Sequence, residues 1–479
     1  MTAVQGADRT AGQDVKRRSG QAAGPRALIV TSNFPPDASV GTMRTLRLVR
    51  HLAAEGWNVD VLTAAPEGFR HGTVVDPMLL DRVPPAVRAI RARALRPIER
   101  LSAALRRRTR PRTNAASRPS SAGVPRETPV ARRRLSMLKA AATACLTLPD
   151  REVSWLIPAL VRAWREVSPD RPDVIYSTGP PFTPHVVAAV LARVMGRPWV
   201  AEFRDPWARA PWREDRFTFE RRAWQVLERA IVTRADAVVF ATDANCRDFA
   251  SYYGAAIASR FHVVPNGCDT SEFEGLVRRP DASGRFVLLH AGSLYGARNP
   301  AGLFQALARA LASGALDARD VSVRFVGRTS GAGLDLPALV RDLGLDSIVQ
   351  FADQMPRRAV LQEMVNASAL LIVQPVTTVS IPAKLYEYMA AGRPILALAE
   401  PGGDTAELVQ RSGAGIAVAA HDERAIEEAL VTMVRGASGA RPPVDPRAYD
   451  GALRAADVAA ILWDLMPAPS RAPEPATTP

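Results

Sequence analysis

The sequence has few cysteines, no long apolar run and no export signal, and each absence narrows what the chain can be. Its three cysteines, Cys145, Cys246 and Cys268, show neither a disulfide framework nor paired metal-ligand spacing, which favours a reducing compartment. No uninterrupted apolar stretch approaches the roughly 20 residues that cross a bilayer, so we expect any membrane contact to be peripheral. The first residues are polar and Gly-rich, without the apolar core of a signal peptide. These absences predict a cytoplasmic protein, or one peripheral to the inner face of the cell membrane.

Short apolar runs alternate with helical patterns along most of the chain. The clearest runs cover residues 27–33, 58–64, 173–179, 286–293, 321–327 and 369–375. Strands that alternate with helices of this length predict parallel sheets covered on both faces. At 479 residues and 47% hydrophobic composition, the chain can bury two cores. The sequence therefore predicts an α/β protein of two doubly wound domains, with a hinge near residues 269–284.

Positive charge is concentrated in one segment, residues 82–135. The segment holds sixteen arginines and two acidic residues, Glu99 and Glu127, a surplus equal to the whole formal net charge of +14. The rest of the chain is balanced, which argues against a nucleic-acid-binding protein. The segment is rich in Arg, Pro and Ser without an apolar period, which predicts a solvated loop or flexible insertion. With the apolar stretch that follows, it suits an anionic membrane surface; an insertion without a partner and a nucleic-acid arm are the alternatives.

Loops after the strands of the first half carry the first candidate residues. In sheets of this kind ligands bind beyond the carboxyl ends of the strands, and the cleft between two domains is the default site. Gly41 and Arg44 follow the first strand, where the N-terminus of a helix can face an anion, although a glycine there is also typical of a plain turn. The spacing around Gly41 is not G-x-G-x-x-G, so a Rossmann dehydrogenase finds no support. His185 opens a later helix and can equally be a capping or packing residue.

Two further loops of this half add charged and amide side chains. Arg204 and Asp205 end a strand in the stretch AEFRDPW, where charged side chains project toward the predicted cleft. The alternative is an Asp N-cap beside a surface arginine. Asn266 ends another strand in a turn-forming set that a structural role alone would explain.

In the second half, two helix starts combine glycine, serine and charge. Gly292 and Ser293 end a strand, and Arg298 follows just before Asn299 and Pro300, which are predicted as the N-cap and first residue of a helix. Backbone amides and an arginine at such a position suit a phosphate, although a capped helix with a solvent arginine fits equally well.

The stretch SIPAKLYEYMAAGRPILAL also allows either a ligand-binding role or a structural one. Ser380 is predicted to cap its helix and Gly392 to end it. Lys384 and Glu387 then share one face, where a cation would meet phosphate oxygens and a carboxylate would accept two sugar hydroxyls. An exposed ion pair between the two is the alternative.

The stretches NGCDTSEF (266–273), HAGSL (290–294) followed by Arg298, and IPAKLYEYMAAGRPILA (381–397) resemble the family 4 glycosyltransferases, retaining enzymes of the GT-B fold. STGPPFTPH and AEFRDPW further resemble a bacterial subgroup that assembles cell-surface polysaccharides. The resemblance implies two Rossmann-like domains facing across a cleft, with residues 26–268 on the acceptor side and residues 269–445 binding a nucleotide sugar. Residues 1–25 are expected to be a tail, and residues 446–479 a helix and tail.

Carried over by position, the resemblance assigns roles to several candidates. Glu387 matches the second glutamate of the family's E-x7-E motif, which holds the nucleotide ribose, and Arg298 stands where a phosphate-binding lysine is common. Gly41 lies in the loop that faces the donor phosphates.

Three positions depart from the family pattern. Val379 replaces the first glutamate of E-x7-E. Ser293 replaces a frequent arginine, whose charge Lys384 can supply. Arg204 replaces a frequent catalytic histidine, which leaves Asp205 as the polar group beside the reacting sugar.

The implied reaction is transfer from a nucleotide-diphosphate sugar, as co-substrate, to a glycan or lipid-linked acceptor. No cofactor or metal is expected, because fixed dipoles and cations can stabilise the departing diphosphate and no Asp-x-Asp pair occurs in the sequence. By the resemblance, the leaving phosphate itself deprotonates the acceptor. The alternatives are a nucleotide-sugar 2-epimerase of similar build and an inactive scaffold that binds nucleotide sugars.

Overall fold

The computed structural model describes residues 24–70, 72–96, 137, 140–167, 170–212, 217–294, 298–329, 335–436 and 446–466. Within these residues, the first half of the chain forms a parallel sheet of seven strands in the order β3-β2-β1-β4-β5-β6-β7. Its strands are β1 (Arg26–Val30), β2 (Asn58–Ala64), β3 (Arg88–Ala92), β4 (Val174–Gly179), β5 (Trp199–Phe203), β6 (Ala237–Phe240) and β7 (Phe261–Val263). Its α-helices are α1 (Val40–Ala54), α4 (Leu156–Glu166), α5 (Thr183–Met195), α6 (Thr218–Arg234), α7 (Asp243–Tyr253) and α8 (Ala255–Ala258).

The second half forms a parallel sheet of six described strands in the order β10-β9-β8-β11-β12-β13. The strands are β8 (Phe286–Ala291), β9 (Val321–Val326), β10 (Val349–Ala352), β11 (Ala369–Gln374), β12 (Ile395–Ala399) and β13 (Gly415–Val418). The helices are α9 (Ala301–Ala312), α10 (Leu336–Asp342), α11 (Arg357–Asn366), α12 (Ala383–Ala390), α13 (Asp404–Arg411), α14 (Glu423–Arg435) and α15 (Gly451–Asp464). The 3₁₀ turns are η1 (Pro66–Gly68), η2 (Pro77–Leu80), η3 (Val153–Trp155), η4 (Thr270–Phe273) and η5 (Pro446–Tyr449).

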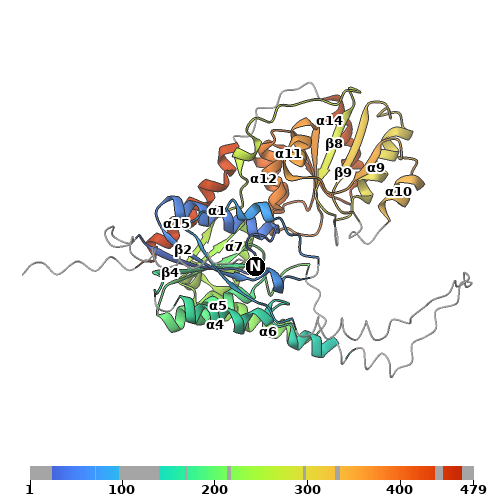
Figure 1. Cartoon of the computed structure of the whole chain (residues 1–479). Helices are drawn as coiled ribbons and strands as arrows, with labels where there is room; N and C mark the ends of the chain where they lie inside the picture. Colours follow the sequence, from blue (N-terminus) through green and yellow to red (C-terminus); the bar gives the residue numbers. More distant parts are fainter. Residues whose placement is uncertain are drawn as a thin grey trace, which may run out of the picture.

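Both sheets are buried between helices, which explains their continuous apolar strands. In the first half, α4, α5 and α6 cover one face of the sheet, and α1 covers the other (Figure 1). Helix α15, the last helix described, lies beside α1 rather than on the second sheet, and its Val458 and Leu462 share a core with Leu46 and Val49. The predicted α/β fold with two doubly wound sheets is confirmed.

The prediction for residues 82–135 is wrong at its start, because residues 88–92 form the edge strand β3. Ile90 is buried, whereas Arg88 reaches across to β2, where its Nε and Nη2 donate to the Asp60 carboxylate at 2.7 Å each. From sequence alone, Arg88 is indistinguishable from the arginines of a loop, although it is paired on an edge strand. The rest of the predicted insertion falls largely outside the described residues, as do residues 1–23 and 467–479 of the predicted tails.

Two predicted helix starts differ from the structure. Ser380 does not cap α12: Pro382 is the N-cap, and the Ser380 hydroxyl instead contacts Gln374 Nε2 at 3.3 Å and Thr377 Oγ1 at 3.4 Å. The residue before a proline is pushed away from helical geometry, so the helix starts only after Pro382. Helix α9 likewise starts at Ala301 with Pro300 as N-cap.

None of the helices in the described part of the chain has the length and apolarity needed to cross a bilayer.

Candidate functional site

Lys384 and Gly292 form the centre of the site in the second half. Lys384, at the start of α12, points back to the end of β8, where its Nζ lies 3.3 Å from His290 Nε2. Gly292 has a φ of +128°, and a Cβ added there would lie 2.6 Å from Lys384 Nζ. The Gly292 amide donates to the Val326 carbonyl at 2.8 Å. Gly292 therefore provides the space that the ammonium group fills, while its own N–H is already used.

Burial and a second cation weaken the charge on Lys384. Burial, followed by the repulsion from Arg298, lowers the pKa of Lys384 to about 7, while Glu387 opposes the shift. Burial and Lys384 together lower the pKa of His290 well below its usual value, so this ring is neutral beside the ammonium. The repulsion between Lys384 and Arg298 costs free energy, and a bound diphosphate would relieve that cost.

Glu387 pairs with Arg357 and not with Lys384, so the alternative of an exposed ion pair between Lys384 and Glu387 is wrong. Its Oε1 lies 2.9 Å from Arg357 Nη2, at the start of α11. Arg357 also donates to Glu272 at 2.7 Å, and Glu272 accepts at 2.8 Å from Arg82 of the first half. Burial opposes the charge on Arg357, but Glu387 and Glu272 outweigh it and raise its pKa. One carboxylate oxygen of Glu387 is thus anchored by a chain of ion pairs that spans both halves.

Arg204 packs against the start of α1 in the first half. Its guanidinium donates to the carbonyls of Gly179 (3.3 Å), the last residue of β4, and of Pro180, which follows it. A Cβ on Gly41 would collide with this guanidinium, so Gly41 again supplies space for a cation. Burial lowers the pKa of Arg204 and raises that of its neighbour Asp205.

Asp205 connects the two halves of the site electrostatically. Arg204 and then Arg298 of the second half act against burial and favour its carboxylate form. A direct contact joins the halves nearby, where Thr242 Oγ1 donates to the Val379 carbonyl at 3.0 Å. Gly41, Arg204 and Asp205 therefore lie together, on the side of the first sheet that faces Arg298, Gly292 and Lys384.

Arg44 and Asn266 occupy a different, internal position. The Arg44 Nε donates to Glu202 Oε1 at 2.7 Å, and its other nitrogens reach the carbonyls of Val264 (2.8 Å) and Pro265 (2.7 Å) and the Asn266 side chain (3.2 Å). Burial disfavours both charges, but each stabilises the other, so the pKa of Arg44 is raised and that of Glu202 is lowered. The guanidinium of Arg44 is thus already satisfied inside the protein.

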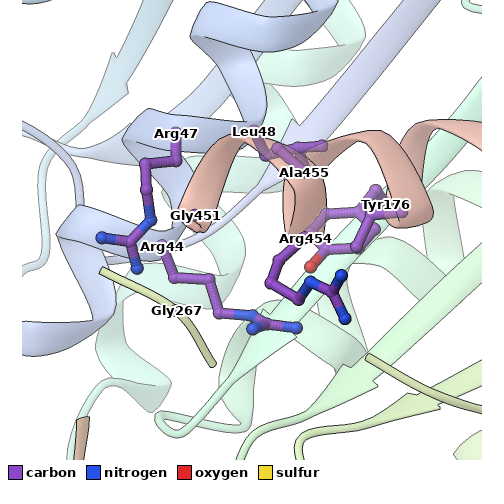
Figure 2. Close-up of a pocket in the computed structure, with 9 residues that line it drawn as sticks. Arg44, Arg47, Leu48, Tyr176, Gly267, Gly451, Arg454 and Ala455 are labelled. Carbon is purple, nitrogen blue, oxygen red and sulfur yellow. The ribbon is translucent and has the colours of Figure 1, made fainter. Parts of the chain in front are cut away.

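A small internal cavity of about 10 Å³ separates Arg44 from α15 (Figure 2). Arg47 of α1 and Arg454 of α15 line it together with Gly451 and the Tyr176 ring. A space of this size holds at most one water molecule, so it belongs to the packing of α15 on α1.

His185 and Ser293 are neighbours of site residues: the His185 ring lies near Arg204, and Ser293 directly follows Gly292. His185 is fully buried in α5, its Nδ1 is 2.8 Å from Ser177 Oγ, and burial lowers its pKa to about 3. A histidine that stays neutral in the core favours the packing role given as the alternative. Ser293 is exposed beyond the end of β8.

Two residues of this site, His290 and Arg357, are not among those predicted from the sequence. His290 is the one polar side chain of strand β8, which is otherwise apolar and fully buried, and that contrast is a usable signal. Arg357 follows the carboxyl end of β10 as the first residue of a helix, but only tertiary structure brings it to Glu387.

A cavity of about 470 Å³ opens in the first half, beyond the ends of β1 and β2. Its lining combines polar residues, among them Asn33, Asp37 and Glu152, with apolar ones such as Phe69 and Val74. Asp37 is held in place, since it accepts from Asn33 Nδ2 at 2.7 Å and from the Ser39 amide at 2.8 Å. The cavity is large enough for a sugar-sized ligand.

Comparison with known proteins bears on both halves. Residues 121–272 match the family model Glycosyltransferase Family 4, and residues 285–435 match Glycosyl transferases group 1. A D-inositol 3-phosphate glycosyltransferase of Kineococcus radiotolerans is 31% identical over 236 residues, which cover 45% of this chain and 54% of that protein. The chain thus spans about half the length of the curated relatives it matches.

Solved structures share the whole architecture. Sucrose-phosphate synthase from Thermosynechococcus elongatus superposes with a TM-score of 0.57 at 17% identity, covering 92% of this chain and 97% of that one. The Anabaena protein HepE, in complex with UDP and glucose, gives a TM-score of 0.57 at 14% identity, covering 92% and 100%. At such identities the likeness shows the shared fold. Since the two family domains follow one another on the two sheets of this fold, the chain belongs to the family 4 glycosyltransferases of the GT-B fold.

Proposed function

We propose that the chain transfers a hexose, with retention of configuration, from a nucleotide-diphosphate sugar to a hydroxyl of a glycan or lipid-linked acceptor. The observation that carries the proposal is the convergence of Lys384 and Arg298 on one side with Asp205 on the other. Partly buried cations that repel one another favour a ligand with at least two negative charges, and a diphosphate meets that requirement.

In this proposal the donor diphosphate lies against Lys384 and Arg298. Negative charge grows on the diphosphate as its bond to the sugar carbon breaks, so fixed cations stabilise the transition state more than the ground state. The two cations perform this task without a metal ion. The leaving phosphate oxygen accepts the acceptor proton late in the reaction.

Glu387 holds the ribose. Arg357 anchors Oε1, which leaves Oε2 directed to the sugar hydroxyls and restricts the rotamers of the carboxylate. We take uridine as the first base to test, because HepE, which shares the fold, is in complex with UDP and glucose.

The acceptor enters from the first half, and the 470 Å³ cavity is our candidate for its binding space. Asp205 orients a hydroxyl of the acceptor or of the donor sugar. The relatives named for transfer to an inositol phosphate support a polar, polyhydroxylated acceptor. We place the enzyme in cell-surface polysaccharide synthesis, at the inner face of the cell membrane.

A panel of nucleotide sugars tests the proposal, with release of free nucleotide measured with and without acceptors. Transfer predicts acceptor-dependent release and a product whose anomeric configuration, read by NMR, matches the donor. An epimerase would interconvert nucleotide sugars without an acceptor, and an inactive scaffold would bind without turnover. Lys384→Met is the negative control, because it lacks the side chain that is proposed to contact the phosphate.

A further inference from the structure

The outer surface of α4, α5 and α6 carries large apolar side chains at helical spacing. The three helices lie side by side under the first sheet (Figure 1). Their inner sides pack in the core through residues such as Ala159, Val187 and Ile231. The exposed apolar residues are Ile157 (63%), Val161 (45%) and Trp164 (56%) on α4, Val190 (40%) and Val194 (53%) on α5, and Phe219 (37%) and Val226 (67%) on α6.

These residues form a stripe on each helix. Spacings of three, four and seven residues return to the same side of a helix, so each stripe follows the helix axis. Single exposed apolar residues are common on soluble proteins, whereas three adjacent helices with aligned stripes mark an interaction surface.

The same surface is strongly cationic. The three helices contain seven arginines and three glutamates. Glu228 is buried and turned inward, where its Oε1 accepts from Tyr253 at 3.0 Å, and Glu166 is paired with Arg162 at 2.7 Å. Exposed arginines thus flank the apolar stripes with little opposing charge.

The combination of apolar stripes and exposed arginines indicates which kind of partner this surface binds. A second copy of the chain on the same surface would bring two arginine-rich faces together, which repel each other. Nucleic acid would contact the arginines but would leave the isoleucine, valine and tryptophan side chains exposed to water. An anionic bilayer uses both, because apolar side chains and tryptophan enter the headgroup boundary while arginine side chains reach lipid phosphates.

We propose that the outer face of α4, α5 and α6 docks the protein on an anionic lipid bilayer. The proposal goes beyond the proposed function and does not depend on it, since vesicle binding is measured without any sugar substrate. It also assigns the membrane contact to folded helices, in addition to the arginine-rich segment inferred from sequence.

Co-sedimentation with vesicles tests the proposal in the full-length chain. Neutral phosphatidylcholine vesicles are compared with vesicles containing 30% phosphatidylglycerol, at low and high salt. The test variant is Arg165→Glu/Arg193→Glu/Arg222→Glu, and the matched control reverses three exposed arginines of the second half, Arg341→Glu/Arg411→Glu/Arg424→Glu. Each basic residue near an anionic surface contributes about 1 kcal/mol, so the test variant should bind anionic vesicles roughly 100-fold or more weakly.

A second variant separates the apolar contribution from charge. Val161→Ser/Trp164→Ser should weaken vesicle binding at high salt, where electrostatic attraction is screened. The control Val277→Ser, exposed elsewhere, should not. Thermal melting confirms that each variant is folded.

Three results would overturn the proposal. One is equal vesicle binding by the wild type and the folded arginine variant. Another is a wild-type dimer that either variant dissociates, which would assign the face to a second copy. The third is tighter binding to duplex DNA than to anionic vesicles, lost in the arginine variant.

Discussion

Lys384 should make donor binding depend on pH above neutrality. Because burial and Arg298 lower its pKa to about 7, the empty site holds a mostly charged lysine at pH 6 and a mostly neutral one at pH 8.5. A bound diphosphate restores the proton, so its affinity falls as pH rises through 7. For a group with a pKa of about 7, the charged fraction drops about 30-fold between these two values, which sets the largest expected loss of affinity.

Titration calorimetry with UDP provides the assay. Between pH 6 and 8.5 the wild-type Kd should rise by up to about 30-fold, and close to one proton should be taken up per UDP at pH 8. Proton uptake is obtained from two buffers of different ionisation enthalpy. His290 contributes nothing in this range, because its pKa lies well below its usual value.

Two substitutions isolate the lysine. Lys384→Met removes the charge at every pH, and Lys384→Arg keeps it, because a guanidinium does not lose its proton in proteins. Both should give flatter affinity profiles than the wild type, with Lys384→Arg the tighter binder at pH 8.5. A wild-type profile that matches that of Lys384→Met in slope and proton uptake would refute the assignment.

Three further predictions concern neighbouring residues. Glu387→Gln should lower UDP affinity about tenfold or more by calorimetry, with an almost unchanged Tm, since each charge-assisted hydrogen bond contributes about 1.5–3 kcal/mol; unchanged affinity would reduce Glu387 to a surface residue. Arg357→Gln should cost less UDP affinity than Glu387→Gln, because Arg357 only orients the carboxylate, and a larger loss would mean that it contacts the nucleotide itself. Asp205→Asn should lower kcat while leaving the UDP Kd within about twofold; a kcat equal to that of the wild type would remove Asp205 from the reaction.

The sequence predicted the sheets well because their evidence is local. Strand β12 is buried at every residue, and its sequence ILALA is one uninterrupted apolar run. Strand β3 was not predicted, because an edge strand with two arginines has the sequence pattern of a loop. Only the tertiary structure shows its pairing with β2, where Arg88 contacts Asp60.

The candidate site was predictable only in part. The position of Lys384 and Glu387 at a helix start near a strand end could be inferred, since both lie on the same short stretch. The chain contains three lysines against 59 arginines, so a lysine at this point is itself a signal. The sequence predicts a ligand-binding role for Arg44, but its partner Glu202 is 158 positions away, and no local pattern shows that the guanidinium is already satisfied.

The sequence by itself determined the α/β class, the two sheets and the helix that carries Lys384, because hydrophobic periodicity and turn residues act over a few positions. Tertiary structure alone decided which charges meet. Arg357 came to Glu387, Arg298 to Lys384 and Asp205, and Arg204 to Gly41, each across a large sequence separation. Electrostatic interactions depend on distance and burial rather than on order in the chain, so the charge state of the site follows only from the fold.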